Sequence, residues 1–287
     1  MSGATDVVSS AEDDDVHRAW MRAVFAEAAI EASATVVGGA VFGWRDRSLG
    51  ARVHAESAEL WLRVVTEQEQ WAGGEFWTGN TDANAIIGIP KPRVLRDWEW
   101  AEGTTRLRAE LMTLAEGQQC SPTPELRFPV ELPDRWWRML RESLRALAVV
   151  PTSRTYLTEN EVARRLRVFF GDRADPTVSE WTAAHADLHW ANLIVPDLAI
   201  VDWEGWGIAP AGFDAATLYL HSLLQPATAK QMRTEFDELL EHRDGLISQL
   251  YVTTRILLRI EHGDYPDLAI PLHHNAERVL ERLRGRR

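Results

Sequence analysis

The sequence predicts an α+β protein with two lobes, the first rich in strands and the second in helices. At 287 residues the chain is long enough for two domains. Segments with strand-like alternation or β-branched content dominate up to Gly117, and a proline-rich loop follows at residues 118–133. Beyond this loop helical periodicity prevails, with one hairpin embedded. Strands followed by helices are typical of the α+β class.

The composition is that of a globular protein, with 45% hydrophobic and 26% charged residues, and it excludes disordered, collagen-like and coiled-coil classes. The net charge of −12 lacks the basic excess of nucleic-acid binders. Cys120 is the only cysteine, so no internal disulfide can form. No apolar run reaches the roughly 18 residues of a membrane span, and the first residues do not resemble a signal peptide. We therefore expect a cytoplasmic protein that binds neither nucleic acid nor membrane.

The first 34 residues predict an N-terminal leader and one helix. Acidic residues predominate in this segment, which is typical of a solvated stretch, and we expect residues 1–15 to be flexible. From Val16 to Ala34, apolar side chains recur near helical spacing, which predicts the helix.

Residues 35–117 predict the strand-rich lobe. In residues 36–55, apolar stretches flank a turn rich in glycine and arginine, which is typical of a hairpin. Residues 58–65 predict a further strand, and two more strands follow, joined by a turn at Glu102–Gly103. Residues 66–90, which lie between the strand at 58–65 and the two later strands, contain glycine at Gly73–Gly74 and Gly79–Asn80. Glycine interrupts regular structure, so we expect this segment to be irregular.

Residues 118–287 predict the helix-rich lobe. Residues 134–149 place large apolar side chains on one face of a helix, and residues 160–170 predict a second helix. Two short apolar stretches flank Pro196–Asp197, which predicts a short hairpin. From Asp214 onward helical periodicity dominates.

Residues with the chemistry of a catalytic site lie at the two ends of this short hairpin. The stretch from His185 to Asn192 is H-A-D-L-H-W-A-N, and Asp202 begins the sequence D-W-E after the hairpin. Because a hairpin returns its ends to nearly the same place, we expect the oxygens of Asn192 and Asp202 to converge. Such oxygens suit Mg²⁺, which also prefers phosphate. Asp187 can accept the proton of a substrate hydroxyl, as phosphoryl transfer requires.

This segment resembles the aminoglycoside phosphotransferase family, whose fold is similar to that of protein kinases. Family members typically show H-G-D-x-H-x-x-N, an apolar strand that ends in D-W-E, and then G-x-x-P-x-G-x-D, here residues 207–214. The resemblance implies that Asp187 is the catalytic base and that Asp214 braces the catalytic loop. It implies that Asn192 and Asp202 hold Mg²⁺.

The resemblance also implies a nucleotide site, with ATP or GTP as the phosphoryl donor. The stretch LMTLAEG, residues 111–117, is similar to the last N-lobe strand and the hinge whose backbone binds adenine in the family, and it places the lobe boundary near Gly117. Two positions depart from the family pattern: Arg63 stands where a lysine is usual, and Ala186 replaces a glycine. The candidate nucleotide-binding residues are Arg63, the turn residues Arg45, Arg47 and Ser48, and Met112 and Leu114 near the hinge.

We therefore expect a small-molecule kinase that transfers a γ-phosphoryl group to a hydroxyl of an aminoglycoside-like antibiotic or of a metabolite. Antibiotic resistance is the family's familiar role, but the fold does not identify the acceptor. Three alternatives stay open at this point. Arg63 and the atypical glycine loop favour a nucleotide-binding module without catalysis, and the kinase-like motif allows a protein kinase, against which the D-W-E element argues. The H-x-D-x-H pattern allows a metallohydrolase.

Two sets of residues are left undecided by the sequence. The glutamate that partners Arg63 is one of Glu67, Glu69 and Glu75. The candidate acceptor-binding residues, besides Asp187, are Glu204, Tyr219, His221, Tyr251 and Glu261.

Overall fold

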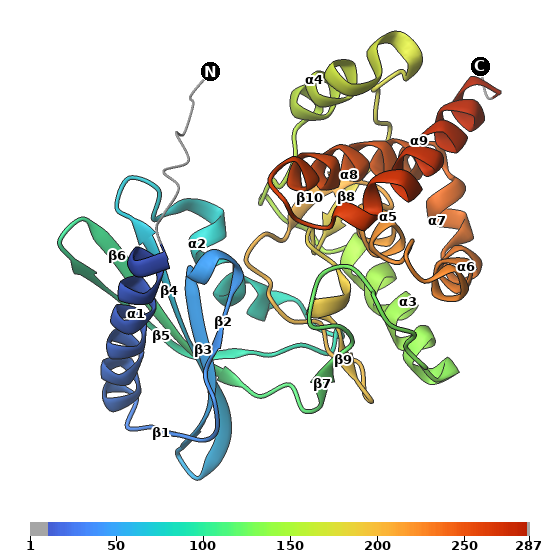
Figure 1. The fold of residues 1–287 in the computed structure, drawn as a ribbon. Coiled ribbons are helices and arrows are strands. Elements are labelled where there is room, and N and C mark those ends of the chain that lie inside the picture. The colour runs from blue at the N-terminus through green and yellow to red at the C-terminus, as the bar shows by residue number, and fades with distance from the viewer. Residues whose placement is uncertain (1–10, 286–287) are drawn as a thin grey trace. The chain divides into compact units, whose positions relative to one another are not determined.

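The computed structural model describes residues 11–285, which divide into two compact units (Figure 1). The first unit ends at Trp77 and resumes over Pro92–Leu114, and the second comprises Thr78–Lys91 and the chain from Ala115 onward. The first unit is built mainly of strands and the second mainly of helices, so the predicted α+β class is confirmed.

The first unit is built on a six-stranded antiparallel sheet of order β1-β3-β4-β6-β5, with β2 also paired to β3. The predicted hairpin in residues 36–55 is confirmed: β2 and β3 pair around a short 3₁₀ turn at Trp44–Asp46. The strands are β1 Thr35–Val36, β2 Val41–Phe42, β3 Ser48–Ala55, β4 Ala58–Gln68, β5 Val94–Glu102 and β6 Thr105–Thr113.

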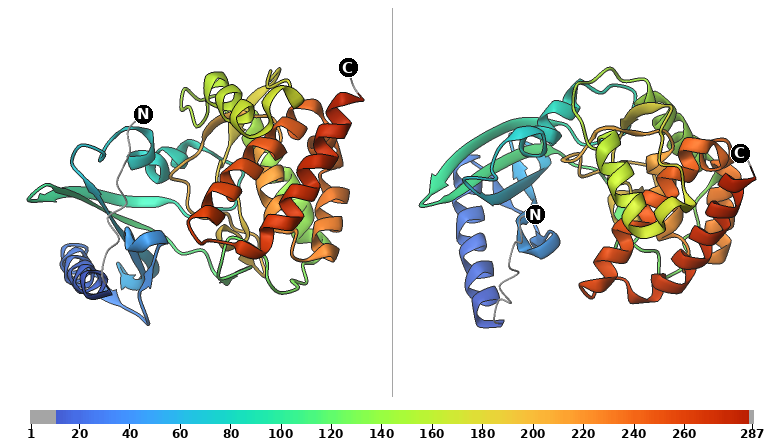
Figure 2. Two further views of the ribbon diagram at one scale, coloured as in Figure 1. Left: turned by 45° about the horizontal axis from the view of Figure 1, so that its top comes forward. Right: turned by 90° about the horizontal axis from the view of Figure 1, so that it is seen from above.

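Helix α1, Ala11–Glu31, lies along one face of this sheet (Figures 1 and 2). Its buried residues Met21, Val24 and Phe25 join one apolar core with the inward side chains of β3, β4 and β6. The helix begins at Ala11, so the prediction that residues up to 15 are flexible is wrong where the structure describes them, and residues 1–10 lie outside the described part of the chain.

Helix α2, Gly74–Asp82, occupies a segment that the sequence predicted to be irregular, so that prediction is wrong. Gly73 and Gly74 do adopt positive φ, but they precede the helix or begin it rather than interrupting it. Gly79 lies inside the helix, where its missing side chain allows a close backbone contact described below. The 3₁₀ turn Ala83–Ala85 follows.

The second unit is a helical assembly with two short strand pairs, and α8 and α9 lie side by side in both views of Figure 2. Its core contains the fully buried Trp136 and Trp190. None of the helices between residues 11 and 284 combines the length and the apolar character that a membrane span needs.

The predicted helices of the second unit are confirmed within a residue or two. The helices are α3 Asp134–Ala148, α4 Glu159–Phe170, α5 Phe213–His221, α6 Pro226–Glu235, α7 Asp237–Glu241, α8 Arg243–Glu261 and α9 Ala269–Arg284, with 3₁₀ turns at Gly171–Arg173, Trp190–Asn192 and Pro266–Leu268. The strand pairs are β8 Trp181–Ala184 with β10 Gly207–Pro210 and β7 Gln118–Gln119 with β9 Ile194–Val195.

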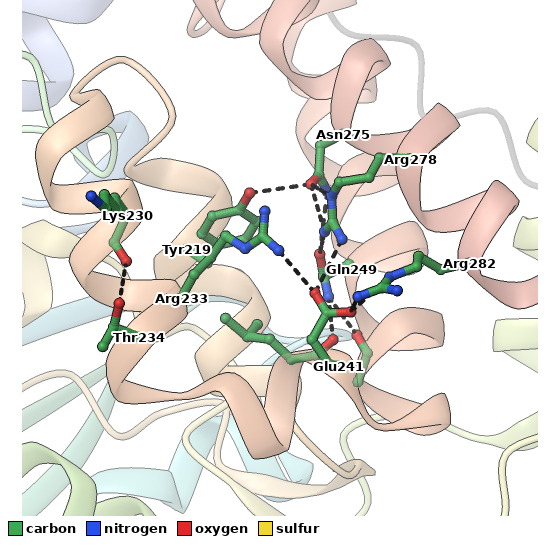
Figure 3. Close-up of polar contacts among 11 residues, drawn as sticks. Tyr219, Lys230, Arg233, Thr234, Glu241, Gln249, Asn275, Arg278 and Arg282 are labelled. Atoms are coloured by element: carbon green, nitrogen blue, oxygen red, sulfur yellow. Dashed lines mark hydrogen bonds and ion pairs between the residues drawn. The ribbon is translucent and has the colours of Figure 1, made fainter.

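One carboxylate connects the C-terminal helices (Figure 3). Glu241, at the end of α7, accepts from Arg233 of α6 at 3.2 Å and from Arg278 of α9 at 3.1 Å. Arg282, one turn further along α9, lies 3.1 Å from the same carboxylate. Arg278 also donates to Gln249 of α8 at 2.9 Å. This network fixes α8, which carries residues of the site described next.

Candidate active site

The predicted short hairpin is confirmed and positions two of the candidate residues. Leu193 pairs with Ile200 as an antiparallel bridge, and the amide of Val201 donates to the carbonyl of Asn192 at 3.0 Å. Asp202 therefore directly follows Val201, which is hydrogen-bonded to Asn192. Asp202 has φ +65°, in the left-handed region that few non-glycine residues adopt. Such backbone strain is concentrated at functional sites in proteins.

The loop that carries Asp187 is held by a buried carboxylate. Asp214, at the start of α5, accepts the amide of His185 at 2.7 Å and that of Ala186 at 2.9 Å. This is the bracing contact that the resemblance implied. Burial raises the pKa of Asp214 to about 6, although the two backbone donors act in the opposite direction. Ala186 has φ +71°, the backbone conformation for which the family's glycine is suited.

The imidazole of His185 is fully buried and fixes the loop to the hairpin. Its Nε2 lies 3.0 Å from the carbonyl of Val201, and its ring packs edge-on against Trp203 at 4.8 Å. Burial lowers the pKa of His185 to about 4, so the imidazole is neutral near pH 7. The loop and the two ends of the hairpin are therefore one connected structure.

The Asp187 side chain is 46% exposed and is surrounded by basic groups. His189 Nε2 lies 3.5 Å from Oδ2, and Arg255 Nη2 lies 3.4 Å from Oδ1. Burial alone would raise the pKa of Asp187, but His189 and Arg255 outweigh it and hold this pKa below its usual range. The carboxylate is therefore ionised at neutral pH and can accept a proton or a hydrogen bond.

Asn192 is oriented by the same loop. Its side-chain amide nitrogen donates to the carbonyl of Asp187 at 3.0 Å, and the residue is 6% exposed. Within residues 11–285, no hydrogen bond to its amide oxygen is found. That oxygen and the carboxylate of Asp202 are both oxygen donors of the kind that Mg²⁺ prefers. No group of three or more His, Cys, Asp or Glu side chains in the described chain converges as a metal site.

Residues without a distinguishing sequence pattern support the D-W-E segment. Asn80 Oδ1 accepts the amide of Trp203 at 2.9 Å, and Trp206 Nε1 donates to the carbonyl of Gly79 at 3.0 Å. The Cα of Gly79 is so close to Glu204 that a Cβ would lie 2.1 Å from the Glu204 carbonyl oxygen. These pairs are more than 120 residues apart in the chain, so no local pattern could have indicated them.

Arg154 donates hydrogen bonds to the backbone of the same segment. It donates from Nε to the carbonyl of Trp206 at 2.9 Å and from Nη2 to that of Glu204 at 3.0 Å. Its Nη1 lies 2.6 Å from Asp82, at the end of α2. Glu204 thus contributes its backbone to the support of the loop that carries Asp202.

The candidate nucleotide-binding residues lie in the first unit or at its end. Arg63 of β4 faces Glu110 of β6, with Nη1 at 3.2 Å from the carboxylate, and its side chain is 15% exposed. Glu67, one of the three glutamates proposed as its partner, is bound by Arg47 at 2.6 Å. The sequence missed Glu110 because the pair is formed across strands.

The remaining candidates surround the β2–β3 turn and the end of β6. Arg45 has φ +51°, and its guanidinium lies 4.6 Å from the Trp44 ring centre. Ser48 begins β3, and its carbonyl accepts the amide of Gly43 at 2.8 Å. Met112 is buried within β6, and Leu114 is the half-buried last residue of the first unit.

The proposed acceptor-binding residues divide into buried and exposed groups. Tyr219 is 5% exposed and donates to Asn275 at 3.3 Å, and His221 is 6% exposed with Nδ1 bonded to the Thr217 carbonyl at 2.8 Å. Glu261 is exposed at the end of α8. Tyr251 is 4% exposed and packs beside Phe213.

Comparison with known structures identifies the fold. No protein-family model matches the chain, and no curated protein matches it in sequence. A thermostable mutant of aminoglycoside phosphotransferase APH(4)-Ia, in ternary complex with ADP and hygromycin B, is similar with a TM-score of 0.63 and 15% identity over 91% of this chain and 98% of that chain. Spectinomycin phosphotransferase APH(9)-Ia, with ADP and spectinomycin, has a TM-score of 0.50 and 11% identity over 92% and 93%.

The chain therefore has the fold of the aminoglycoside phosphotransferases, and the resemblance drawn from His185–Asp214 is confirmed at the level of fold. The neighbours are small-molecule kinases in complex with adenine nucleotides. At these identities the likeness carries the fold, and the chemistry has to be argued from the residues of this chain.

Proposed function

We propose that the chain is a small-molecule kinase that transfers the γ-phosphoryl group of ATP or GTP to a hydroxyl group. The observation that supports this proposal is that Asp187, Asn192 and Asp202 lie on one loop and hairpin connected by hydrogen bonds. Transfer by such a site depends on positioning and charge neutralisation rather than on covalent chemistry.

Each residue has a distinct part in the proposed reaction. Asp187 accepts the proton of the acceptor hydroxyl. The hydroxyl oxygen bonds to the γ-phosphorus while the bond between the γ-phosphorus and the nucleoside diphosphate breaks. Asn192 and Asp202 would hold Mg²⁺, which neutralises phosphate charge when bound. Asp214 and His185 keep the loop in place. Arg63, at the lysine position of the family, is proposed to supply positive charge to the nucleotide phosphates.

The test replaces the carboxylate without changing its shape. Asp187→Asn should lower ADP release from Mg-ATP with an accepted alcohol by about 10²- to 10⁴-fold, which is the usual contribution of a general base. The thermal shift caused by Mg-ATP should remain. Asp197→Asn is the matched control, because Asp197 lies at the turn of the neighbouring hairpin and its side chain is 76% exposed. Turnover by Asp187→Asn at the rate of this control would contradict the assignment.

One observation favours a second candidate, a nucleotide-binding module without catalysis. Arg63 replaces lysine, and its guanidinium is engaged by Glu110. Because arginine and lysine bind phosphates with different geometry, this departure bears directly on the nucleotide. A thermal shift with Mg-ATP, combined with no ADP release above the Asp187→Asn background for any acceptor, would establish the module and exclude the kinase.

A further inference from the structure

Asp187 shares its immediate surroundings with an arginine of α8. Arg255 Nη1 donates to the carbonyl of Ala186 at 3.1 Å, and Nη2 lies 3.4 Å from Asp187 Oδ1. The guanidinium lies 5.5 Å from the centre of the Tyr156 ring, and the side chain is 27% exposed. One cation therefore contacts both the backbone and the carboxylate of the proposed catalytic loop.

A second arginine contacts an aromatic ring of the same helix. Arg165 of α4 places its guanidinium 5.3 Å from the ring centre of Tyr251, which lies on α8 one turn before Arg255. Helices α4 and α8 pack against each other. Burial raises the pKa of Tyr156 to about 12, and the charges of Arg255 and Arg165 oppose this increase while that of Asp187 adds to it. Arg165 and Arg255 therefore contact one group of aromatic rings, in which Phe213 lies 6.1 Å from Tyr251 and 6.0 Å from the Arg255 guanidinium.

Arg165 differs from Arg255 in having no carboxylate partner in the part of the chain that the structure describes. Among residues 11–285 no carboxylate lies within 4.0 Å of its guanidinium. Glu161, one turn earlier on α4, is directed to the helix N-terminus, where it accepts the amide of Thr158 at 2.8 Å. Three carboxylates of this region are paired with arginines: Asp187 with Arg255, Glu125 with Arg127, and Asp264 with Arg259.

This charge distribution disfavours a polycationic acceptor. A protonated amine brought to Asp187 meets a carboxylate that Arg255 and His189 already contact. An anionic group instead gains charge-assisted, bidentate hydrogen bonds from an arginine whose charge is not yet compensated. Repulsion of the wrong charge and attraction of the right one both contribute to specificity.

Building on the proposed kinase function, we propose that the acceptor is an alcohol that also bears a carboxylate or phosphate group, and that Arg165 binds this anionic group. The hydroxyl is phosphorylated by ATP to give a phosphate monoester and ADP, and its proton passes to Asp187. Arg255 keeps Asp187 ionised and in place, as its contacts indicate.

The experiment measures ADP release from Mg-ATP with three sets of acceptors: hydroxy acids and sugar phosphates, the matched neutral alcohols and sugars, and aminoglycosides with simple amino alcohols. We expect the highest kcat/KM in the anionic set. Arg165→Gln should reduce kcat/KM for an anionic acceptor, relative to its neutral analogue, at least tenfold and mainly through KM. Arg165→Lys should recover part of this loss. Arg164→Gln, an exposed neighbour on the same helix, is the control and should behave as the wild type.

Several outcomes would overturn the proposal. A higher kcat/KM for neutral or cationic acceptors refutes it, as does an equal effect of Arg165→Gln and Arg164→Gln on the anionic set. If such acceptors are turned over and the turnover depends on Asp187, the kinase function stands and only the acceptor class is wrong. If no acceptor in any set stimulates ADP release, both proposals fall together. Thermal melting of each variant verifies that α4 is intact.

Discussion

Gly79→Ala tests whether the contact between α2 and the D-W-E segment positions Asp202. An ideal Cβ at Gly79 lies 2.1 Å from the carbonyl oxygen of Glu204 and 2.6 Å from its carbonyl carbon. An ordinary contact begins near 3.4 Å, so the two backbones must separate by about 1.3 Å. The obstacle is main chain, which no rotamer change can relieve.

The expected sign is opposite to that of helix propensity. In an unobstructed helix, replacing glycine by alanine stabilises by about 1 kcal/mol. Here the overpacking should cost about 1–3 kcal/mol instead. Because Asp202 lies two residues before Glu204, the displacement reaches the proposed metal ligand. A shift of about 1 Å at reacting groups can lower turnover about 10²-fold.

The assay pairs urea unfolding with ADP release from Mg-ATP. Gly39→Ala is the control, because a Cβ at Gly39 meets no atom within 4 Å and its φ is not in the left-handed region. We expect Gly39→Ala to match the wild type in both measurements. If Gly79→Ala is as stable as the wild type and equally active, the contact does not position Asp202.

Substitutions at three further positions test the packing of the second unit. Burial lowers the pKa of His221 to about 3, so the folded protein takes up this proton less readily than the unfolded chain. The free energy of unfolding should therefore decrease as pH falls below the unfolded pKa near 6.5, by about 3 kcal/mol at pH 4. His221→Asn should remove this part of the acid destabilisation in urea titrations at pH 7 and pH 4. Glu241→Gln should lower the melting temperature by the equivalent of about 1–2 kcal/mol, because three partly exposed arginines lose their counter-charge, and an unchanged melting point would contradict this. Ala186→Gly should change the free energy of unfolding by less than about 1 kcal/mol, since relief of the positive φ offsets the lost methyl group, whereas Ala186→Val should be clearly destabilising in the same urea assay.

The sequence predicted those parts of the site that depend on short-range geometry. Asn192 and Asp202 lie at the two ends of a hairpin whose apolar strands and turn are visible in ten residues, so their proximity follows from local structure. Arg255 and Asn80 were missed for the opposite reason. They are separated by 68 and 123 residues from their partners Asp187 and Trp203, and nothing in their own neighbourhoods distinguishes them from surface residues.

The same distinction explains the error over α2. Glycines at 73, 74 and 79 are local signals for a break in the chain, and the inference from them was sound as local chemistry. The helix forms nonetheless because its C-terminal turn is held by the hydrogen bonds to Trp203 and Trp206 and by the Asp82–Arg154 ion pair. Tertiary contacts of this kind routinely override propensity.

The pKa values of two carboxylates of the site are shifted in opposite directions. This difference assigns the loss of activity at low pH to one of them. Basic neighbours outweigh burial and keep the pKa of Asp187 below its usual range, whereas burial raises that of Asp214 to about 6. As pH falls through 6, Asp214 takes up a proton and weakens its hold on the amides of His185 and Ala186, while Asp187 stays ionised.

Turnover should therefore decline below about pH 6 because the loop loses its brace, and not because the base is protonated. The pKa of Asp214 in the folded protein exceeds the unfolded value near 3.8, so its protonation adds to the free energy of unfolding as pH falls from 6 to 4. Activity should therefore decrease over the pH range in which the contribution of Asp214 to stability increases. Asp214→Asn should give low activity that no longer varies between pH 5 and pH 7. An unchanged acid limb in this variant would assign the ionisation to another group.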